Sequence, residues 1–212
     1  MVTKKIKTDA LDTKEIIMQT AARLFSEKGF EAVSIRELAK EAQVNIAMIA
    51  YHYGSKEGLF KAIVEDKIPK SGVQLKAIQK SEGTAWDKVS MAIDLYIERM
   101  FLSDTFNRLI FRELSLEQRP ENREVIINAI EKNWRIIKQF IEEGQKSGLF
   151  KNEIDPALTV ISMFSTLSMI VNNSSMAARI IGEKEDKAIF SESTKIRVKQ
   201  HLKSMMKAHL LT

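Results

Sequence analysis

A cluster of residues between positions 34 and 56 has side chains suited to contact with nucleic acid. Hydroxyl, imidazole and cationic groups can bind phosphate oxygens. An amide can hydrogen-bond to a base edge, and apolar side chains can contact thymine methyl groups in the major groove. The candidates for phosphate contact are Ser34, Arg36, Tyr51, His52 and Lys56, and those for base contact are Asn45, Ile46, Ala47 and Met48. For His52, a structural cap on its own domain is the alternative interpretation.

Two short helices are predicted to position these side chains. Ser34, with a glutamate three residues later, forms a capping-box pattern that begins a helix over residues 34–42. Asn45 is a favourable N-cap for a second helix that ends near Tyr51. The short link between them is typical of a helix-turn-helix, whose second helix lies in the major groove. Ile49 is expected to anchor that helix to the core.

Further helices flank this pair. Asp12 and Glu15 form another capping-box pattern, which predicts a first helix over residues 12–28. A fourth helix is predicted over residues 55–68, beginning at a serine cap and ending before Pro69. The pattern therefore gives a small helical domain at the N-terminal end of the chain.

The stretches GFEAVSIRELAKEA (residues 29–42) and VNIAMIAYHYGSKEGLF (residues 44–60) resemble the N-terminal domain of TetR-family regulators. The resemblance spans about residues 16–68 and includes helix lengths, the turn position and the aromatic pair after the third helix. Two positions depart from the family pattern. Gln43 stands where glycine is usual in the turn, and Ala50 stands where a phosphate-contacting tyrosine is common.

Beyond the fourth helix, the predicted helices are longer, and no segment has the alternation expected of a strand. The sequence predicts an all-α fold, with a helix-turn-helix DNA-binding domain over residues 1–54 and a larger helical domain over residues 55–212. The longer helices are predicted over residues 86–103, 105–118, 121–146, 156–181 and 194–211. By the resemblance, the larger domain binds a ligand and forms the dimer.

A ligand cavity within the larger domain is implied by the resemblance. Methionine and aromatic side chains suit an irregular apolar pocket, although most such residues are ordinary core. The expected apolar lining residues are Met100, Phe111, Trp134 and Phe164, and the expected polar ones are Arg108, Arg112 and Asn172. Each polar residue has an ordinary surface or interhelical role as its alternative.

Composition excludes several classes of function. The chain has no cysteine, so disulfides, thiolate metal sites and cysteine nucleophiles are absent. No phosphate-binding loop or paired catalytic group is found, and we expect neither catalysis, nor a cofactor, nor a bound metal. The net charge of +5 weakly favours an anionic partner. No secretory signal is found, so a cytoplasmic location is expected, and the uncharged stretch 157–178 is interpreted as a buried helix without membrane contact.

These features predict a homodimer that binds a double-stranded, pseudo-palindromic DNA operator, because one recognition helix reads only half a site. The expected interface combines residues 157–178 with Ile196, Leu202, Met205 and Met206 of the last helix. The family resemblance implies repression that an unidentified small-molecule effector relieves, with the fourth helix coupling the two sites. The alternative is a structural or partner-recruiting DNA-binding protein of the same fold that has no small ligand.

Overall fold

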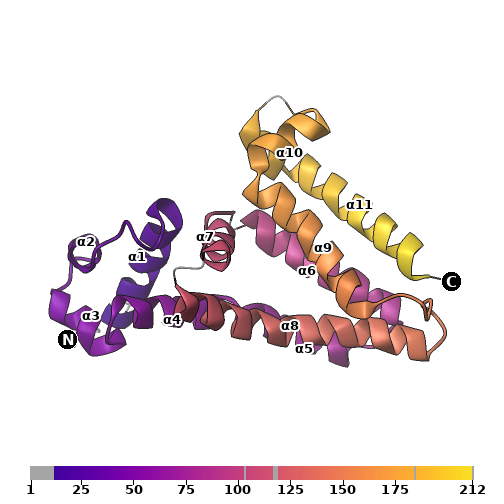
Figure 1. Ribbon diagram of the computed structural model, residues 1–212, viewed down its shortest axis with the longest axis horizontal. Coiled ribbons are helices and arrows are strands. Elements are labelled where there is room, and N and C mark those ends of the chain that lie inside the picture. The colour runs from indigo at the N-terminus through magenta and orange to yellow at the C-terminus, as the bar shows by residue number, and fades with distance from the viewer. Residues whose placement is uncertain (1–11, 103, 117–118, 184, 212) are drawn as a thin grey trace, which may run out of the picture. The chain divides into compact units, whose positions relative to one another are not determined.

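The computed structural model describes residues 12–102, 104–116, 119–183 and 185–211, and these residues form a helical protein (Figure 1). The helices are α1 (Thr13–Lys28), α2 (Ile35–Glu41), α3 (Ile46–Tyr53), α4 (Lys56–Lys67), α5 (Pro69–Lys80), α6 (Ala85–Leu102), α7 (Asp104–Ser115), α8 (Pro120–Lys146), α9 (Pro156–Asn172), α10 (Ser174–Ile181), the 3₁₀ helix η1 (Asp186–Phe190) and α11 (Glu192–Leu210). The predicted all-α fold is confirmed.

The chain forms two compact units, Met1–Ile63 and Val64–Thr212. The division falls inside α4, whereas the sequence analysis placed a domain boundary at residue 54. Three aromatic rings pack together within the core of the first unit. Phe30 lies between Phe25 and Phe60, with ring centroids 5.1 and 5.3 Å away. All three are buried, which fixes α1, the turn before α2 and α4 around one centre.

The start of α1 differs from the prediction. Asp12 precedes the helix but makes no side-chain capping hydrogen bond, so the predicted capping box there is wrong. Glu15 instead accepts a hydrogen bond from Gln19 Nε2, one turn later, at 3.0 Å. The two side chains are therefore paired along the exposed helix surface rather than across its N-terminus.

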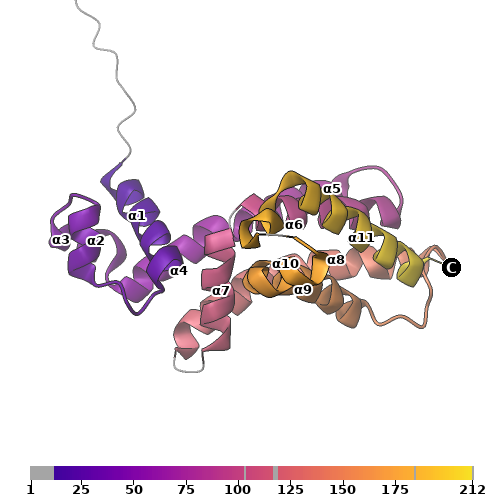
Figure 2. The same cartoon turned by 90° about the horizontal axis from the view of Figure 1, so that it is seen from above.

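In the second unit, α6 contacts both α8 and α11, and α5 packs on α6 and α8 (Figures 1 and 2). The sequence analysis missed α5, because it treated Pro69 only as the end of the preceding helix. Proline is also favoured at the first position of a helix, where its missing N–H costs nothing. Here Pro69 begins α5, which buries Ser71 and Leu75.

The helix predicted over residues 156–181 is wrong as a single element. It consists of α9 and α10, which are bent by 99° at Asn173. Asn172 Nδ2 donates to the Ser168 carbonyl at 2.9 Å, and Asn and Ser side chains of this kind compete with helical backbone bonding. Among the described residues, no single helix is long and apolar enough to cross a membrane, and α9 with α10 meets that test only as a bent pair.

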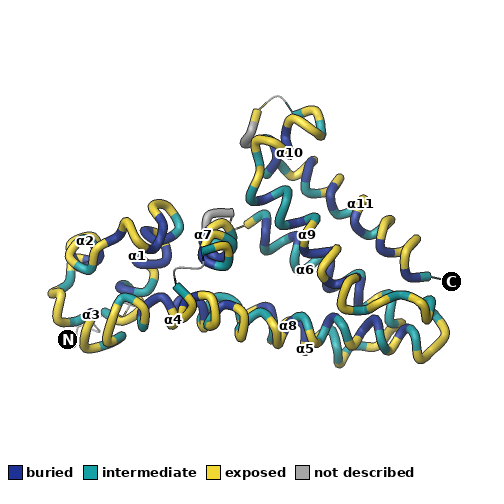
Figure 3. Tube along the Cα trace, in the orientation of Figure 1, coloured by how far each residue is buried: buried dark blue, intermediate teal, exposed yellow. Residues whose placement is uncertain are grey.

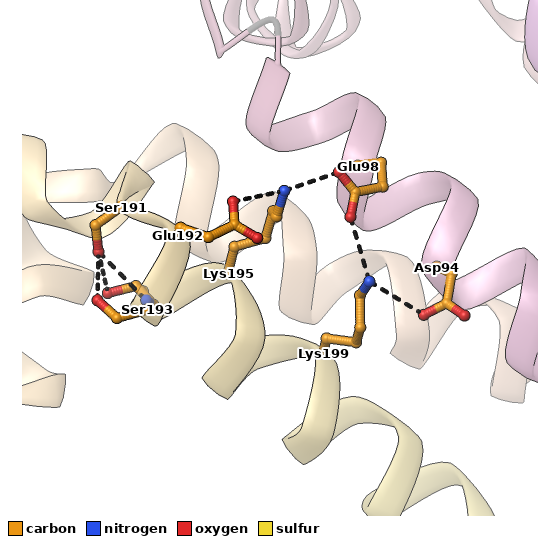
Figure 4. A network of polar contacts seen from close by, with 8 residues as sticks. Asp94, Glu98, Ser191, Glu192, Ser193, Lys195 and Lys199 are labelled. Carbon is orange, nitrogen blue, oxygen red and sulfur yellow. Dashed lines mark hydrogen bonds and ion pairs between the residues drawn. The ribbon is translucent and has the colours of Figure 1, made fainter.

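Charged side chains join α11 to α6 (Figure 4). Lys195 Nζ lies 2.8 Å from Glu98 Oε2, and Lys199 Nζ lies 3.2 Å from Glu98 Oε1. Lys203 Nζ lies 2.6 Å from Asp94 Oδ2. The lysines and the carboxylates each repeat at one-turn spacing, so both rows face one another along the two helices. The hydrogen bonds from the lysines lower the pKa of Glu98.

A buried carboxylate connects α7 to α8. Glu113 is fully buried and accepts hydrogen bonds from Arg119 Nε at 2.9 Å and Arg119 Nη2 at 3.1 Å. Asn122 Nδ2 donates to the same carboxylate at 3.1 Å. A buried charge is tolerated only with such pairing, so this cluster fixes the end of α7 against the start of α8.

Candidate nucleic-acid interface and ligand cavity

The turn of the helix-turn-helix is closed by the backbone. Gln43 has φ 54°, the left-handed conformation that glycine adopts most easily. The Gln43 N–H donates to the Lys40 carbonyl at 3.2 Å, and the Val44 N–H donates to the Ala39 carbonyl at 3.0 Å. This pair of bonds is a Schellman motif, with glutamine at the position that glycine usually holds. The turn geometry is therefore retained in spite of the unusual residue.

Asn45 begins α3 as predicted. Its Oδ1 accepts a hydrogen bond from the Ala47 N–H at 2.9 Å, which satisfies one of the free donors of the first turn. Ile49 is buried and anchors the helix, whereas the Ile46 and Tyr51 side chains are 45% and 80% exposed. An apolar side chain and a tyrosine so open to solvent leave one face of α3 available for contact.

The other predicted base-contact residues lie on α3 as well. Ala47 is exposed and Met48 is half-buried. Because the Asn45 carboxamide oxygen is committed to the helix cap, its Nδ2 group is the part that remains for a base or a phosphate. The local sequence thus places all four base-contact candidates within the first turn of α3.

The start of α2 presents two of the phosphate candidates. Ser34 caps the helix by accepting from the Glu37 N–H at 3.1 Å, and Arg36 is exposed. The capping box is only half formed, because Glu37 pairs with Lys28 Nζ at 2.6 Å instead of reaching back to Ser34. That hydrogen bond lowers the pKa of Glu37. Free N–H groups at a helix start and a nearby arginine together suit a phosphate.

His52 and Lys56 have neighbours inside the first unit. The Nε2 atom of His52 is buried without a hydrogen-bond partner, so this nitrogen is not open to phosphate. Lys56 Nζ lies 4.3 Å from the centroid of the Phe30 ring and 3.5 Å from the Glu31 carbonyl oxygen. These contacts favour the structural interpretation of His52 and direct the Lys56 ammonium toward the turn before α2.

Tyr53 and Gly58 hold the end of α3 in place. The Tyr53 hydroxyl donates to the Lys14 carbonyl on α1 at 2.6 Å. A Cβ atom at Gly58 would overlap the Tyr53 carbonyl oxygen, so α4 can begin this close to α3 only with glycine at that position. The C-terminal end of α3 is thereby held by both α1 and α4.

The second unit contains a partly open cavity of about 360 Å³, within the size range of small-ligand sites. Its walls come from the end of α4 and from α5, α6, α7, α8 and α9. Most of the lining is apolar or aromatic. The lining residues are Lys67, Ile68, Lys70, Ser71, Tyr96, Arg99, Met100, Phe106, Asn107, Ile110, Phe111, Leu114, Ile130, Asn133, Trp134, Ile161, Phe164, Ser165 and Ser168.

All the apolar residues expected in the cavity line it, and the expected polar residues do not. Met100, Phe111, Trp134 and Phe164 lie in its wall, where the Trp134 and Phe164 ring centroids are 5.2 Å apart. The polar candidates are placed elsewhere on the same helices, Arg108 and Arg112 being exposed and Asn172 half-buried.

Other polar residues take their place. Asn133 is buried in the apolar face of α8, and its Nδ2 donates to the Ile68 carbonyl at 3.4 Å. Burial raises the pKa of the Tyr96 hydroxyl, which hydrogen-bonds to Asn133. Arg99 Nη2 donates to the Lys67 carbonyl at 2.8 Å. Asn133 could have been predicted as a lining residue from the sequence, because it is a polar amide at a position where the pattern of α8 is otherwise apolar.

Comparison with family models assigns both units. Residues 17–63 match the model described as bacterial regulatory proteins of the tetR family. Residues 64–181 match the model described as the C-terminal region of YsiA-like protein. The two matches adjoin inside α4, where the compact units also divide.

Individual relatives agree with these matches. The HTH-type transcriptional regulator YttP of Bacillus subtilis is 28% identical over 139 residues, which cover 64% of this chain and 66% of that protein. The structure of FadR from Bacillus subtilis in complex with stearoyl-CoA superposes with a TM-score of 0.72 at 20% identity, covering 90% of this chain and 97% of that one. A transcriptional regulator from Saccharomonospora viridis in complex with choline superposes with a TM-score of 0.68 at 19% identity, covering 94% and 97%.

Proposed function

Because the chain belongs to the TetR family of helix-turn-helix transcriptional regulators, a family of regulators and not of enzymes, we propose that it is a homodimeric repressor released from its operator by a small molecule. The observation that carries the DNA-binding part is the face of α3. Asn45 caps this short helix, Ile49 anchors it, and Ile46 and Tyr51 project from it. A short helix anchored on one side and exposed on the other supports the proposal that α3 is the recognition helix.

The cavity supports the sensing part of the proposal. Its volume of about 360 Å³ and its mostly apolar and aromatic lining are typical of a small-molecule site, which favours sensing over a DNA-binding protein without a ligand. Two proteins of similar fold were solved with small ligands, stearoyl-CoA in one and choline in the other. The effector proposed for this chain is a largely apolar molecule that fits among the rings of Phe111, Trp134 and Phe164.

The dimer is proposed to form through α9 and α11. Exposed positions recur along both helices (Figure 3). The large apolar residues among them are Leu158 and Ile161 on α9 and Ile196 and Met205 on α11. Leu158 and Ile161 are three residues apart and share one face of α9. Exposed apolar side chains suit a packed interface between copies. The list of interface residues from the sequence needs one correction. Leu202 and Met206 are buried within the subunit and cannot be part of it.

DNA binding is tested by selecting operators for the full-length chain from a randomised duplex library. A pseudo-palindromic consensus is expected, and its half-site should change when Met48 is replaced by alanine. The role of Asn45 is tested with Asn45→Ser and not with alanine, because alanine would remove a helix cap worth about 1 kcal/mol. Serine retains a cap and removes only the side-chain amide. If no sequence is enriched, or if Met48→Ala selects the same half-site, the proposed role of α3 is wrong.

Phosphate contacts are tested by salt dependence. Arg36→Gln should weaken binding to specific and random DNA alike and reduce the slope of log affinity against log salt by about 1. Lys56→Gln tests whether the ammonium near the Phe30 ring also reaches the backbone of DNA. An unchanged slope in either variant removes that residue from the contact surface.

A further inference from the structure

Three of the described residues that line the cavity are cationic, and one of them is an arginine. Arg99 on α6 lines the cavity and is half-buried. Its Nη2 donates to the Lys67 carbonyl, and among the described residues no carboxylate forms an ion pair with its guanidinium. Burial lowers the pKa of Arg99. A guanidinium held partly away from water without an opposite charge is costly to the folded protein.

The two lysines of the lining have other neighbours. Lys70 Nζ lies 2.9 Å from Asp66 Oδ2. Lys67 Nζ lies over the Phe106 ring, 5.4 Å from its centroid. The lining residues include no aspartate or glutamate. The cavity is therefore apolar over most of its wall and electropositive at Arg99, which favours an anion and disfavours a cationic ligand such as a quaternary amine.

We propose that Arg99 binds the anionic head group, a carboxylate or a phosphate, of an amphipathic effector whose apolar part lies against Phe111 and Trp134. The inference rests on the proposed function, in that the cavity is taken as the effector site. A guanidinium has five N–H donors in a planar fork, and only one is used by the Lys67 carbonyl. The remaining donors suit a carboxylate or phosphate, which they can bind in a bidentate geometry.

The same guanidinium also acts on α4. Lys67 is the last residue of α4, where carbonyl groups lack helical partners and a nearby cation is stabilising. An anion bound to Arg99 neutralises that cation and competes for its N–H groups. Occupation of the cavity therefore changes the stability of the C-terminal end of α4.

The test uses the fluorescence of Trp134, which lies in the cavity wall. The chain has two tryptophans, so the Trp86→Phe variant leaves Trp134 as the single reporter. This protein is titrated with dodecanoate, dodecyl phosphate, dodecanol and dodecyltrimethylammonium, each below the concentration at which it forms micelles. Both anions, or one of them, should bind about 10- to 100-fold more tightly than the alcohol, as expected for charge-assisted hydrogen bonds. Comparison of the two anions distinguishes a carboxylate from a phosphate head group.

The decisive variant is Arg99→Gln in the Trp86→Phe background. The preferred anion should lose about 10-fold or more in affinity while the affinity for dodecanol stays unchanged. Arg112→Gln, which removes an exposed arginine outside the lining, is the matched control and should bind every probe as the parent does. If Arg99→Gln does not fold, Arg99→Lys replaces it, and an anion affinity between those of the parent and of dodecanol is expected.

Several results would overturn the inference. These are an equal loss of affinity for the anion and the alcohol, no loss for the anion, a preference for dodecyltrimethylammonium, or no saturable binding of either anion. Failure of the proposed function is separable from these, because operator selection does not involve the probes. If the chain binds an operator but shows no anion selectivity, only the proposed role of Arg99 is wrong. If it shows anion selectivity but binds no operator, the proposed repressor function is wrong.

Discussion

Gln43 offers a direct test of the turn between α2 and α3. A non-glycine residue in the left-handed conformation costs about 1–2 kcal/mol, because its Cβ crowds the following carbonyl. Gln43→Gly removes this cost. Glycine also gives the unfolded chain more conformational freedom, which destabilises the folded state by about 0.4–1 kcal/mol. The Schellman hydrogen bonds of Gln43 and Val44 are made by backbone atoms and survive the change. The expected net effect is a stabilisation of about 0.5–1 kcal/mol.

The assay is thermal unfolding followed by circular dichroism. If the whole chain melts cooperatively, the Tm of Gln43→Gly should rise by about 1–4 °C, and by more if the first unit melts alone. The matched control is Lys40→Gly, which places glycine at an exposed position of the same helix with ordinary helical backbone. It should cost about 1 kcal/mol. A Tm that falls in both variants would show that Gln43 is not strained, and the assignment of its conformation would be refuted.

Three further outcomes are expected from the second unit. Arg119→Met should lower the free energy of unfolding by about 3–5 kcal/mol, because it leaves the buried Glu113 carboxylate without its ion pair. In denaturant titrations, the double variant with Glu113→Leu should recover most of that stability. Gly144→Ala should lower the Tm although alanine is the better helix former, because its Cβ would overlap the buried ring of Phe150; an unchanged Tm would refute this packing. The lowered pKa of Glu98 means that its stabilisation is complete above about pH 4.3, the ordinary glutamate value, and is lost as the pH falls through the folded-state pKa. Glu98→Gln should therefore melt below the parent at pH 7, and the difference should shrink as the pH falls below the ordinary glutamate value.

Local signals were sufficient to predict the helix starts near the recognition helix. Ser34 and Asn45 cap α2 and α3, and Asp155 caps α9, because a side chain that bonds to an N–H two or three residues away depends on little else. The same kind of signal was wrong at Asp12, where the side chain makes no such bond. A capping pattern shows that a capping hydrogen bond is possible, but whether the bond forms depends on the surrounding structure.

Tertiary packing accounts for what the sequence did not reveal. The apolar lining residues were predicted because the family resemblance implied a cavity and because methionine and aromatic side chains suit one. Arg99 was missed, since an arginine within α6 looks like a surface residue until α4 and α8 are placed beside it. The break at Asn173 was missed because apolar residues continue on both sides of it. Whether the DNA-contact residues act as proposed stays a prediction for the binding experiments.

The bond between Arg99 and the Lys67 carbonyl limits how this protein can diverge. A gene duplicate that shifts toward a neutral or cationic effector gains by losing the arginine, but the loss also uncaps the C-terminal end of α4. With Arg99 as the proposed anion site, one substitution changes both the ligand preference and the end of α4. A compensating donor for the Lys67 carbonyl has to arise first, for example through the nearby Asn133 amide, which already bonds to the adjacent carbonyl of Ile68. The order of substitutions along such a lineage is set by one hydrogen bond.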